Sequence, residues 1–163
     1  MSAESDSASP PRRIDDSRVE MTELVMPGDA NALGNVFGGR VMALIDKAAA
    51  IVALRHCRSI VVTASVDSID FITPVRLADI MSFQARVTQV FKSSMEVRVD
   101  VYSEDPRTGR RVLTTTAFAT MVSLAGDGRP KPVPRLVLET DAERAEAAAA
   151  DERRKLRLNR RSA

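Results

Sequence analysis

One segment, from about Val36 to His56, constrains the fold of this 163-residue chain more than any other. Its residues are good or tolerable helix formers, and its apolar side chains lie on nearly every side of the helix instead of on one stripe. Only Arg40, Asp46 and Lys47 interrupt its middle. Because a helix that is apolar all round is buried, the segment predicts one long central helix enclosed by the rest of the domain.

Strand patterns fill most of the remaining domain. A shift of the alternation at Asp67-Ser68 predicts a β-bulge. Short turns join the later strands, so the sheet should be mainly antiparallel. The predicted strands span residues 19–26, 60–71, 80–91, 95–102 and 111–124.

A sheet that covers so much of one helix must curve around it. We therefore predict an α+β hotdog fold, in which a curved antiparallel sheet of about five strands wraps one long central helix. Because a single such layer leaves a sheet face or edge uncovered, we expect at least a dimer.

The two ends of the chain differ from its middle. Residues 1–18 are rich in Ser, Asp, Pro and Arg and predict a disordered N-terminal tail, so the folded domain should span residues 19–136. Residues 137–163 form a charged tail with helical propensity but no apolar face. Six cations fall between Arg153 and Arg161. They could meet a nucleotide phosphate or RNA, although such a run is more often a solvated face.

Composition excludes several classes of protein. The chain is 44% hydrophobic and 28% charged with a net charge of only +2, so nothing points to nucleic acid. No apolar run approaches the roughly 20 residues of a membrane helix. One cysteine and one histidine leave a His/Cys metal site short of ligands. The polar N-terminus lacks the apolar region of a secretory signal, so we expect a cytoplasmic protein.

Asp46 is the first candidate for chemistry. Burying a carboxylate in an apolar helix is costly unless it is paired. Its helical neighbours Ala43, Ala49 and Ala50 are small and would leave room for a ligand or a water beside the acid. The alternative is a structural Asp paired with Lys47, Arg40 or a backbone amide.

Gly38 and Gly39 open the predicted helix. The unpaired amides of a helix N-terminus suit a developing oxyanion, and glycine lets a substrate approach the backbone closely. Alternatively the pair serves turn geometry alone. Asn31, in the preceding loop, could orient a water or a carbonyl, although beside Pro27 and Gly28 it could equally be a turn residue.

Two further groups carry weaker signals. His56 and Cys57 are adjacent, and neighbouring helical side chains diverge, so a Cys-His dyad is not expected. The Lys92-Ser93-Ser94 loop could hold a phosphate or the pantetheine amide of coenzyme A, or it could be an ordinary polar hairpin.

A set of spaced motifs across about residues 20–136 resembles the hotdog-fold acyl-CoA thioesterases of the YciA and brain acyl-CoA hydrolase type. The matching motifs are Pro27-Gly28-Asp29-Ala30-Asn31, Gly34-Asn35-Val36-Phe37-Gly38-Gly39, Met42, Ile45-Asp46, Arg55-His56-Cys57, Val62-Thr63-Ala64-Ser65-Val66-Asp67, Phe71, Pro74-Val75, Ser94-Met95 and Pro132-Val133-Pro134.

The resemblance implies hydrolysis of acyl-CoA to a carboxylic acid and free coenzyme A, with no further cofactor and no metal. It implies an active dimer, often within a hexamer built as a trimer of dimers, in which Asp46 and Asn31 meet across the dimer interface. The chain departs from the pattern at Ala78, where the family usually has Gly, and at Leu44, where an aromatic residue is common. The first departure could alter a strand turn, and the second could reshape the acyl pocket, which leaves the acyl-chain preference open.

Two other functions remain to be weighed. A hotdog enoyl-CoA hydratase needs an Asp and a His placed together, whereas the single histidine follows Asp46 by nearly three turns. A non-catalytic acyl-CoA-binding regulator would use the same pocket without chemistry at Asp46, and no helix-turn-helix is visible in the sequence to support a DNA-binding role.

Overall fold

The computed structural model describes residues 9–162 of the chain. In chain order its elements are β1 Arg12–Arg13, η1 Ile14–Asp16, β2 Val19–Leu24, η2 Pro27–Asp29, α1 Gly38–Cys57, β3 Ile60–Val66, β4 Ile80–Val90, β5 Ser94–Glu104, β6 Arg111–Leu124, β7 Leu136–Val137 and α2 Asp141–Ser162.

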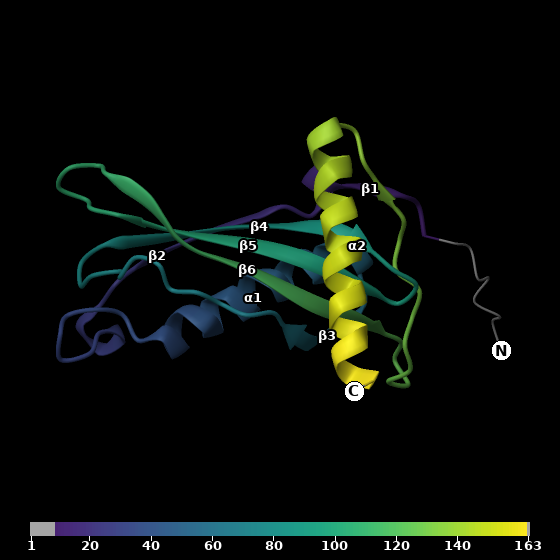
Figure 1. The fold of residues 1–163 in the computed structure, drawn as a ribbon, viewed down its shortest axis with the longest axis horizontal. Coiled ribbons are helices and arrows are strands. Elements are labelled where there is room, and N and C mark those ends of the chain that lie inside the picture. The colour runs from purple at the N-terminus through teal and green to yellow at the C-terminus, as the bar shows by residue number, and fades with distance from the viewer. Residues whose placement is uncertain (1–8, 163) are drawn as a thin grey trace.

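The main sheet has five antiparallel strands in the order β2-β4-β5-β6-β3. Helix α1 joins the two edge strands β2 and β3, so it has to cross one face of the sheet, and Figure 1 shows it behind the strands. The hotdog fold predicted from the sequence is therefore confirmed.

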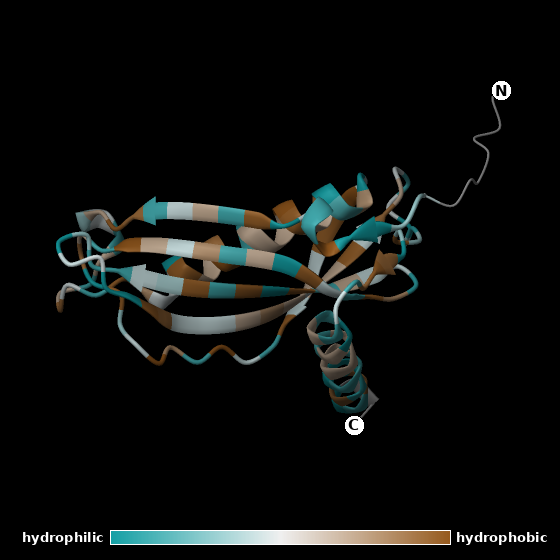
Figure 2. Cartoon of the chain, turned by 90° about the horizontal axis from the view of Figure 1, so that it is seen from above, coloured by the Kyte–Doolittle hydropathy of each residue, from teal (hydrophilic) through white to brown (hydrophobic). Residues whose placement is uncertain are grey.

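The core lies between α1 and the inner face of the sheet. Phe83 on β4, Val97 and Val99 on β5 and Ala119 on β6 are all fully buried. Leu44 of α1 is fully buried in the same cluster. Apolar and polar residues alternate along these strands in Figure 2, as expected for a sheet whose two faces have different surroundings.

The prediction that α1 is buried on every side is wrong for the single chain. The sheet covers only one side, and Met42 and Leu54 on the other side are 48% and 45% exposed. Beside them β3 forms the sheet edge and exposes Ile60 and Val62. We call this surface, formed by the open side of α1 and the β3 edge, the open face. An unpaired apolar edge of this kind favours self-association.

A β-bulge interrupts β3, but earlier than the alternation predicts. The register shifts between Thr63 and Ser65, which pair with Met121 and Thr120 of β6, so Ala64 is the extra residue. The predicted site at Asp67-Ser68 lies beyond the end of the strand. Because the extra residue exchanges the faces, Thr63 points to the α1 side while Ser65 lies opposite the outward-facing Thr120.

The segment between β3 and β4 ends in a turn at Ala78. This residue has a φ of 68°, in the left-handed region that glycine adopts most easily. The turn is kept by hydrogen bonds from the Ala78 amide to Val25 and from the Asp79 amide to Arg76. The departure from glycine therefore leaves a turn in place, with a strained residue in it.

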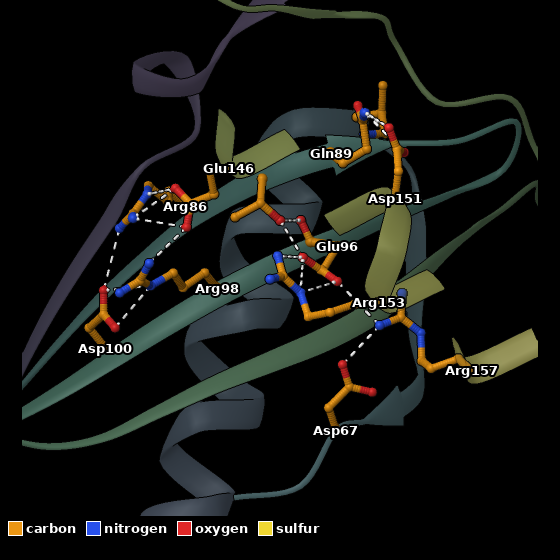
Figure 3. Close-up of polar contacts among 12 residues, drawn as sticks. Asp67, Arg86, Gln89, Glu96, Arg98, Asp100, Glu146, Asp151, Arg153 and Arg157 are labelled. Carbon is orange, nitrogen blue, oxygen red and sulfur yellow. Dashed lines mark hydrogen bonds and ion pairs between the residues drawn. The ribbon is translucent and has the colours of Figure 1, made fainter. Parts of the chain in front are cut away.

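Helix α2 crosses the outer face of the sheet, in front of the strands in Figure 1. It docks through the small buried side chains of Ala147 and Ala150 and through charged contacts. Glu96, fully buried on β5, accepts hydrogen bonds from Arg153 at 2.7 Å and Arg157 at 3.2 Å, and Arg157 also pairs with Asp67 at 2.8 Å. Figure 3 shows a second group in which Arg86 and Arg98 of the sheet meet Glu146 of the helix. The expected solvated tail is instead a packed helix, because the outer sheet face supplies the opposite charges.

The chain ends also differ from the expected boundaries. Of the tail expected over residues 1–18, residues 1–8 lie outside the described residues. Residues 9–18 belong to the folded domain, because β1 pairs in parallel with β7 and Ile14 is only 3% exposed. The elements of the domain thus begin before residue 19 and end after residue 136.

We predict that Glu96→Gln destabilises the protein by about 3–5 kcal/mol, because two guanidinium groups lose their buried counter-charge. Urea denaturation at fixed protein concentration measures the change. Glu152→Gln is the control, since its side chain is 68% exposed and pairs only with Lys155 on the surface; its midpoint should stay close to that of the parent. Equal midpoints for the two variants would contradict charge-driven docking of α2.

Candidate active site

An apolar cavity of about 290 Å³ opens at the start of α1. Gly38 and Val41 line it from the helix, Phe71 and Val75 from the segment after β3, and Thr114 from β6. The N-terminal end of the central helix therefore faces an apolar space, a suitable place for a hydrocarbon chain with a polar group at its head.

Gly38 and Gly39 present free amides at this cavity end of the helix. Among the described residues no acceptor meets either backbone N–H, and the N-cap residue Phe37 makes no side-chain cap. A Cβ on Gly38 would lie 3.4 Å from the Phe71 ring, an ordinary van der Waals contact, so packing against the ring does not by itself require glycine here. Such amides can donate to a carbonyl oxygen and to the oxyanion that forms from it.

Asp46 lies on the open face. It is exposed in the single chain, so the expectation of a buried acid is not met by one subunit. Its Oδ1 accepts a hydrogen bond from the Thr63 hydroxyl at 2.6 Å. The alternative pairing with Arg40 is wrong, because Arg40 bonds Asp29 at 2.9 Å. A carboxylate held by one hydroxyl and unpaired with any described cation keeps lone pairs for a water or a substrate.

Asn31 helps to shape the loop before α1. Its Oδ1 accepts from the amides of Leu33 at 2.9 Å and Asn35 at 3.2 Å, the pattern of an Asx turn. Its side-chain N–H₂ has no acceptor among the described residues. The turn function is therefore present, and a donor remains for another molecule.

A single chain does not bring all the predicted site residues together. Asp46 follows Gly38 by eight helical residues, about 12 Å along the axis. Neither Asp46 nor Asn31 lines the cavity at Gly38. The Lys92-Ser93-Ser94 hairpin lies at the far end of β5, roughly 30 Å from the end nearer to that cavity.

A two-fold dimer would change this arrangement. If β3 pairs antiparallel with the β3 of a second copy, the two α1 helices lie side by side with opposite directions. The open face supplies both the apolar surface and the unpaired strand for such a contact.

Thr63 is the functional candidate that sequence reasoning did not single out. The residue stands in a motif that carries the family resemblance, but nothing in the strand alternation distinguishes it from its neighbours. Only the bulge after it and the position of α1 place its hydroxyl on Asp46. Only the tertiary structure therefore identifies Thr63 as a functional candidate.

His56 and Cys57 do not form a site. The His56 Nε2 lies 3.0 Å from the Pro134 carbonyl oxygen, and burial lowers the pKa of this histidine. Burial also raises the pKa of the Cys57 thiol. His56 stands about 15 Å along the helix from Asp46. The structure thus offers no Asp-His pair of the kind that a hydratase needs.

The described residues give no support for a metal site or for a membrane-spanning helix. They contain no group of three or more His, Cys, Asp or Glu side chains placed to bind a metal ion. Within residues 9–162, neither long helix has a stretch that is apolar enough to cross a bilayer.

Comparison with known proteins gives one family. A family model described as the thioesterase superfamily matches residues 33–110. An uncharacterized acyl-CoA thioester hydrolase of Bacillus subtilis, YkhA, is 47% identical over 128 residues, which cover 78% of this chain and 74% of the relative. The mouse cytosolic acyl coenzyme A thioester hydrolase is 40% identical over 137 residues. These cover 82% of this chain but only 36% of the mouse protein.

Solved structures agree with this. An apo-hexameric acyl-CoA thioesterase superposes with a TM-score of 0.89 at 41% identity, covering 93% of this chain and 97% of the other. An acyl-CoA hydrolase of Staphylococcus aureus, solved with butyryl coenzyme A and coenzyme A, gives a TM-score of 0.87 at 37% identity, covering 93% of each chain. The same Staphylococcus aureus enzyme has also been solved with one Asp, one Asn or one Thr replaced by alanine.

We predict that Cys57 is unreactive in the folded protein, because burial removes both access and thiolate. With a chromogenic disulfide at neutral pH, the native thiol should react at least roughly tenfold more slowly than the thiol in urea. The urea-unfolded sample of the same protein is the control. A native rate equal to the unfolded rate would contradict the burial of this thiol.

Proposed function

The chain belongs to the thioesterase superfamily, and from that premise we propose that it hydrolyses acyl-CoA to a free carboxylic acid and coenzyme A, with Asp46 as the catalytic carboxylate. The observation that carries the proposal is the contact between Asp46 and Thr63 on the open face of α1. It holds an ionisable group in a fixed position without neutralising it.

The Staphylococcus aureus enzyme supports this choice of residues. The Asp, the Asn and the Thr that were replaced there are separated along the chain as Asp46, Asn31 and Thr63 are separated here. The apo-hexameric relative and the coenzyme A complexes support an acyl-CoA substrate and self-association. We therefore assign Asp46, Thr63 and Asn31 to one composite site.

The chemistry proceeds in two steps. The thioester carbonyl oxygen lies against the amides of Gly38 and Gly39, which stabilise the negative charge that develops on it. Asp46 takes a proton from a water while the water oxygen bonds to the carbonyl carbon. The tetrahedral intermediate collapses, the C–S bond breaks, and the thiolate of coenzyme A leaves and takes up the proton. A thiolate is a good leaving group, so the reaction needs neither a metal nor a further cofactor.

A second route is open to the same residue. Asp46 could attack the carbonyl directly and form a mixed anhydride, which water then hydrolyses. A single turnover in water labelled with heavy oxygen demonstrates the anhydride route if label enters Asp46. The general-base route places the label in the product acid alone, whereas hydrolysis of the anhydride at the protein carboxyl places it in Asp46.

The site is completed by a second subunit. In one chain the start of α1 and Asp46 are about 12 Å apart, and the open face is the surface that remains for a partner. A β3-to-β3 dimer brings the Gly38 amides and Asn31 of one subunit to Asp46 of the other. Three such dimers make the hexamer. Lys92, Ser93 and Ser94 can contribute to coenzyme A binding only if a neighbouring subunit carries the substrate to that end of the sheet.

The alternative functions fit less well. A hydratase lacks its histidine, because His56 is turned to Pro134 and away from Asp46. A purely binding hotdog protein would have no need of an unpaired carboxylate on the open face. By likeness to the cytosolic mouse relative, we place the enzyme in the cytoplasm. The basic residues of α2 do not need nucleic acid as a partner, since several of them pair with the sheet.

We predict that Asp46→Asn lowers kcat by at least about a thousandfold, since the general base contributes up to roughly four orders of magnitude. Release of free thiol from a panel of short and long acyl-CoAs measures it. Lys47→Gln, at the next exposed position of α1, is the matched control and should keep most activity. Parental turnover by Asp46→Asn on every chain length would disprove the assignment.

We also predict that two inactive variants complement each other. Asn31→Ala and Asp46→Ala subunits, unfolded together and refolded, form mixed dimers in which one of the two sites is intact. About a quarter of the parental activity should return, because half of randomly paired dimers are mixed and each holds one complete site. Each variant refolded alone is the control. If mixing restores nothing although mixed dimers form, Asp46 and Asn31 act within one subunit.

A further inference from the structure

A second cavity lies on the outer face of the sheet, under the C-terminal half of α2. Its volume is about 180 Å³, and we call it the α2 cavity. Its polar lining consists of Ser65 from β3, Ser94 from β5, Thr120 from β6, and Arg154 and Arg157 from α2. A water molecule takes roughly 30 Å³ of liquid, so the cavity can hold a group several times that size.

Two polar atoms of this lining have no partner. The Nη2 of Arg157 and the Oγ1 of Thr120 are buried, and neither makes a hydrogen bond within the described residues. The Arg157 side chain is only 9% exposed. Buried donors without acceptors are rare in folded proteins, and here two of them belong to residues that line one space. They point to an acceptor that the chain itself does not supply.

The charge around the cavity is also unbalanced. Arg153 and Arg157 pair with Glu96, and Arg157 also pairs with Asp67. Arg154 adds a third guanidinium that meets no carboxylate among the described residues. Three positive groups therefore face two negative ones, and one further negative charge would complete the set.

Arg154 is nevertheless held in place. Its guanidinium lies over the Phe91 ring, 4.1 Å from the centroid, and its Nη1 lies 3.4 Å from the Ser94 hydroxyl. Stacking on the ring fixes the plane of the guanidinium and leaves its N–H edge free to donate. A positioned arginine without a carboxylate suits an oxyanion that accepts two hydrogen bonds at once.

We propose that the α2 cavity binds a phosphate group, held by Arg154 and Arg157 and by the hydroxyls of Thr120 and Ser65. A tetrahedral oxyanion offers several acceptors to donors that converge from different directions. It would satisfy the Nη2 of Arg157 and the Oγ1 of Thr120 after small side-chain rotations. The bound group would also connect α2 to β3 and β6, and so stabilise the docked helix.

This site is separate from the catalytic carboxylate proposed above, although Ser94 belongs both to its lining and to the loop suggested for coenzyme A. Asp46 and Thr63 lie on the α1 side of the sheet, whereas Ser65 and Thr120 face α2, because the bulge at Ala64 exchanges the faces of β3. Binding at the α2 cavity therefore does not depend on thioester hydrolysis, and the two proposals can fail independently. Because Ser65 stands on the edge strand, each subunit of a β3-paired dimer would carry one cavity beside the interface.

The test uses the full-length protein and inorganic phosphate as the probe. Calorimetric titration and thermal unfolding are followed with added phosphate, and with chloride at the same ionic strength as the reference. We expect saturable phosphate binding and a rise in Tm that chloride does not produce. A titration with glycerol phosphate, a phosphomonoester, shows whether a free or an esterified phosphate binds more tightly.

The variants are chosen to keep α2 docked. Arg154→Gln and Thr120→Val should each weaken phosphate binding by roughly tenfold, while thioester hydrolysis without phosphate stays at the parental rate. Arg157→Gln is avoided because Glu96 would lose a partner. Arg160→Gln, which removes an exposed charge from the same helix, is the matched control and should bind as the parent does. The proposal is overturned if phosphate acts no differently from chloride, or if Arg154→Gln binds phosphate as tightly as Arg160→Gln.

Discussion

The structure depends on the one-sided burial of α1 against the sheet. Leu44, Ala48 and Val52 on one side of this helix are fully buried, and they pack on the inward residues of β4, β5 and β6. Removing this apolar surface from water is the main source of the domain's stability. The same contact fixes what remains outside: the side of α1 that carries Asp46, and the edge of β3.

That division between covered and open sides explains why the site is incomplete in one chain. The free amides at Gly38 lie at one end of the helix, and Asp46 lies on its open side two turns further on. A carboxylate in this position can be exposed in the subunit without cost and then enclosed when a second subunit adds. Catalysis and assembly are thus proposed to use one surface, and loss of the dimer would remove the site together with the interface.

The outer face of the sheet uses a different kind of interaction. Glu96 is fully buried although it is charged, and Arg153 and Arg157 of α2 reach it from a helix whose buried apolar residues, Ala147 and Ala150, are small. A buried ion pair repays the loss of hydration only when its hydrogen bonds are nearly complete. Here one amino group of Arg157 remains unmatched, and for this reason the inner edge of α2 points to a ligand and not to a closed structural contact.

The sequence alone determined the central helix and the antiparallel strands, because helix and strand periods and turn residues are local properties. Its spaced motifs carried the resemblance to the family, and together with the local pattern they gave Asp46, Asn31, Gly38 and Gly39 as candidates. The sequence misplaced the bulge of β3 and read α2 as a solvated tail, since strand register and the charges opposite a helix come from distant segments. The contact of Thr63 with Asp46 joins a strand to a helix. Only the packing of α1 on the sheet decided that the acid would lie on the open face, because the sheet covers one side of the helix and leaves the other side uncovered in the single chain.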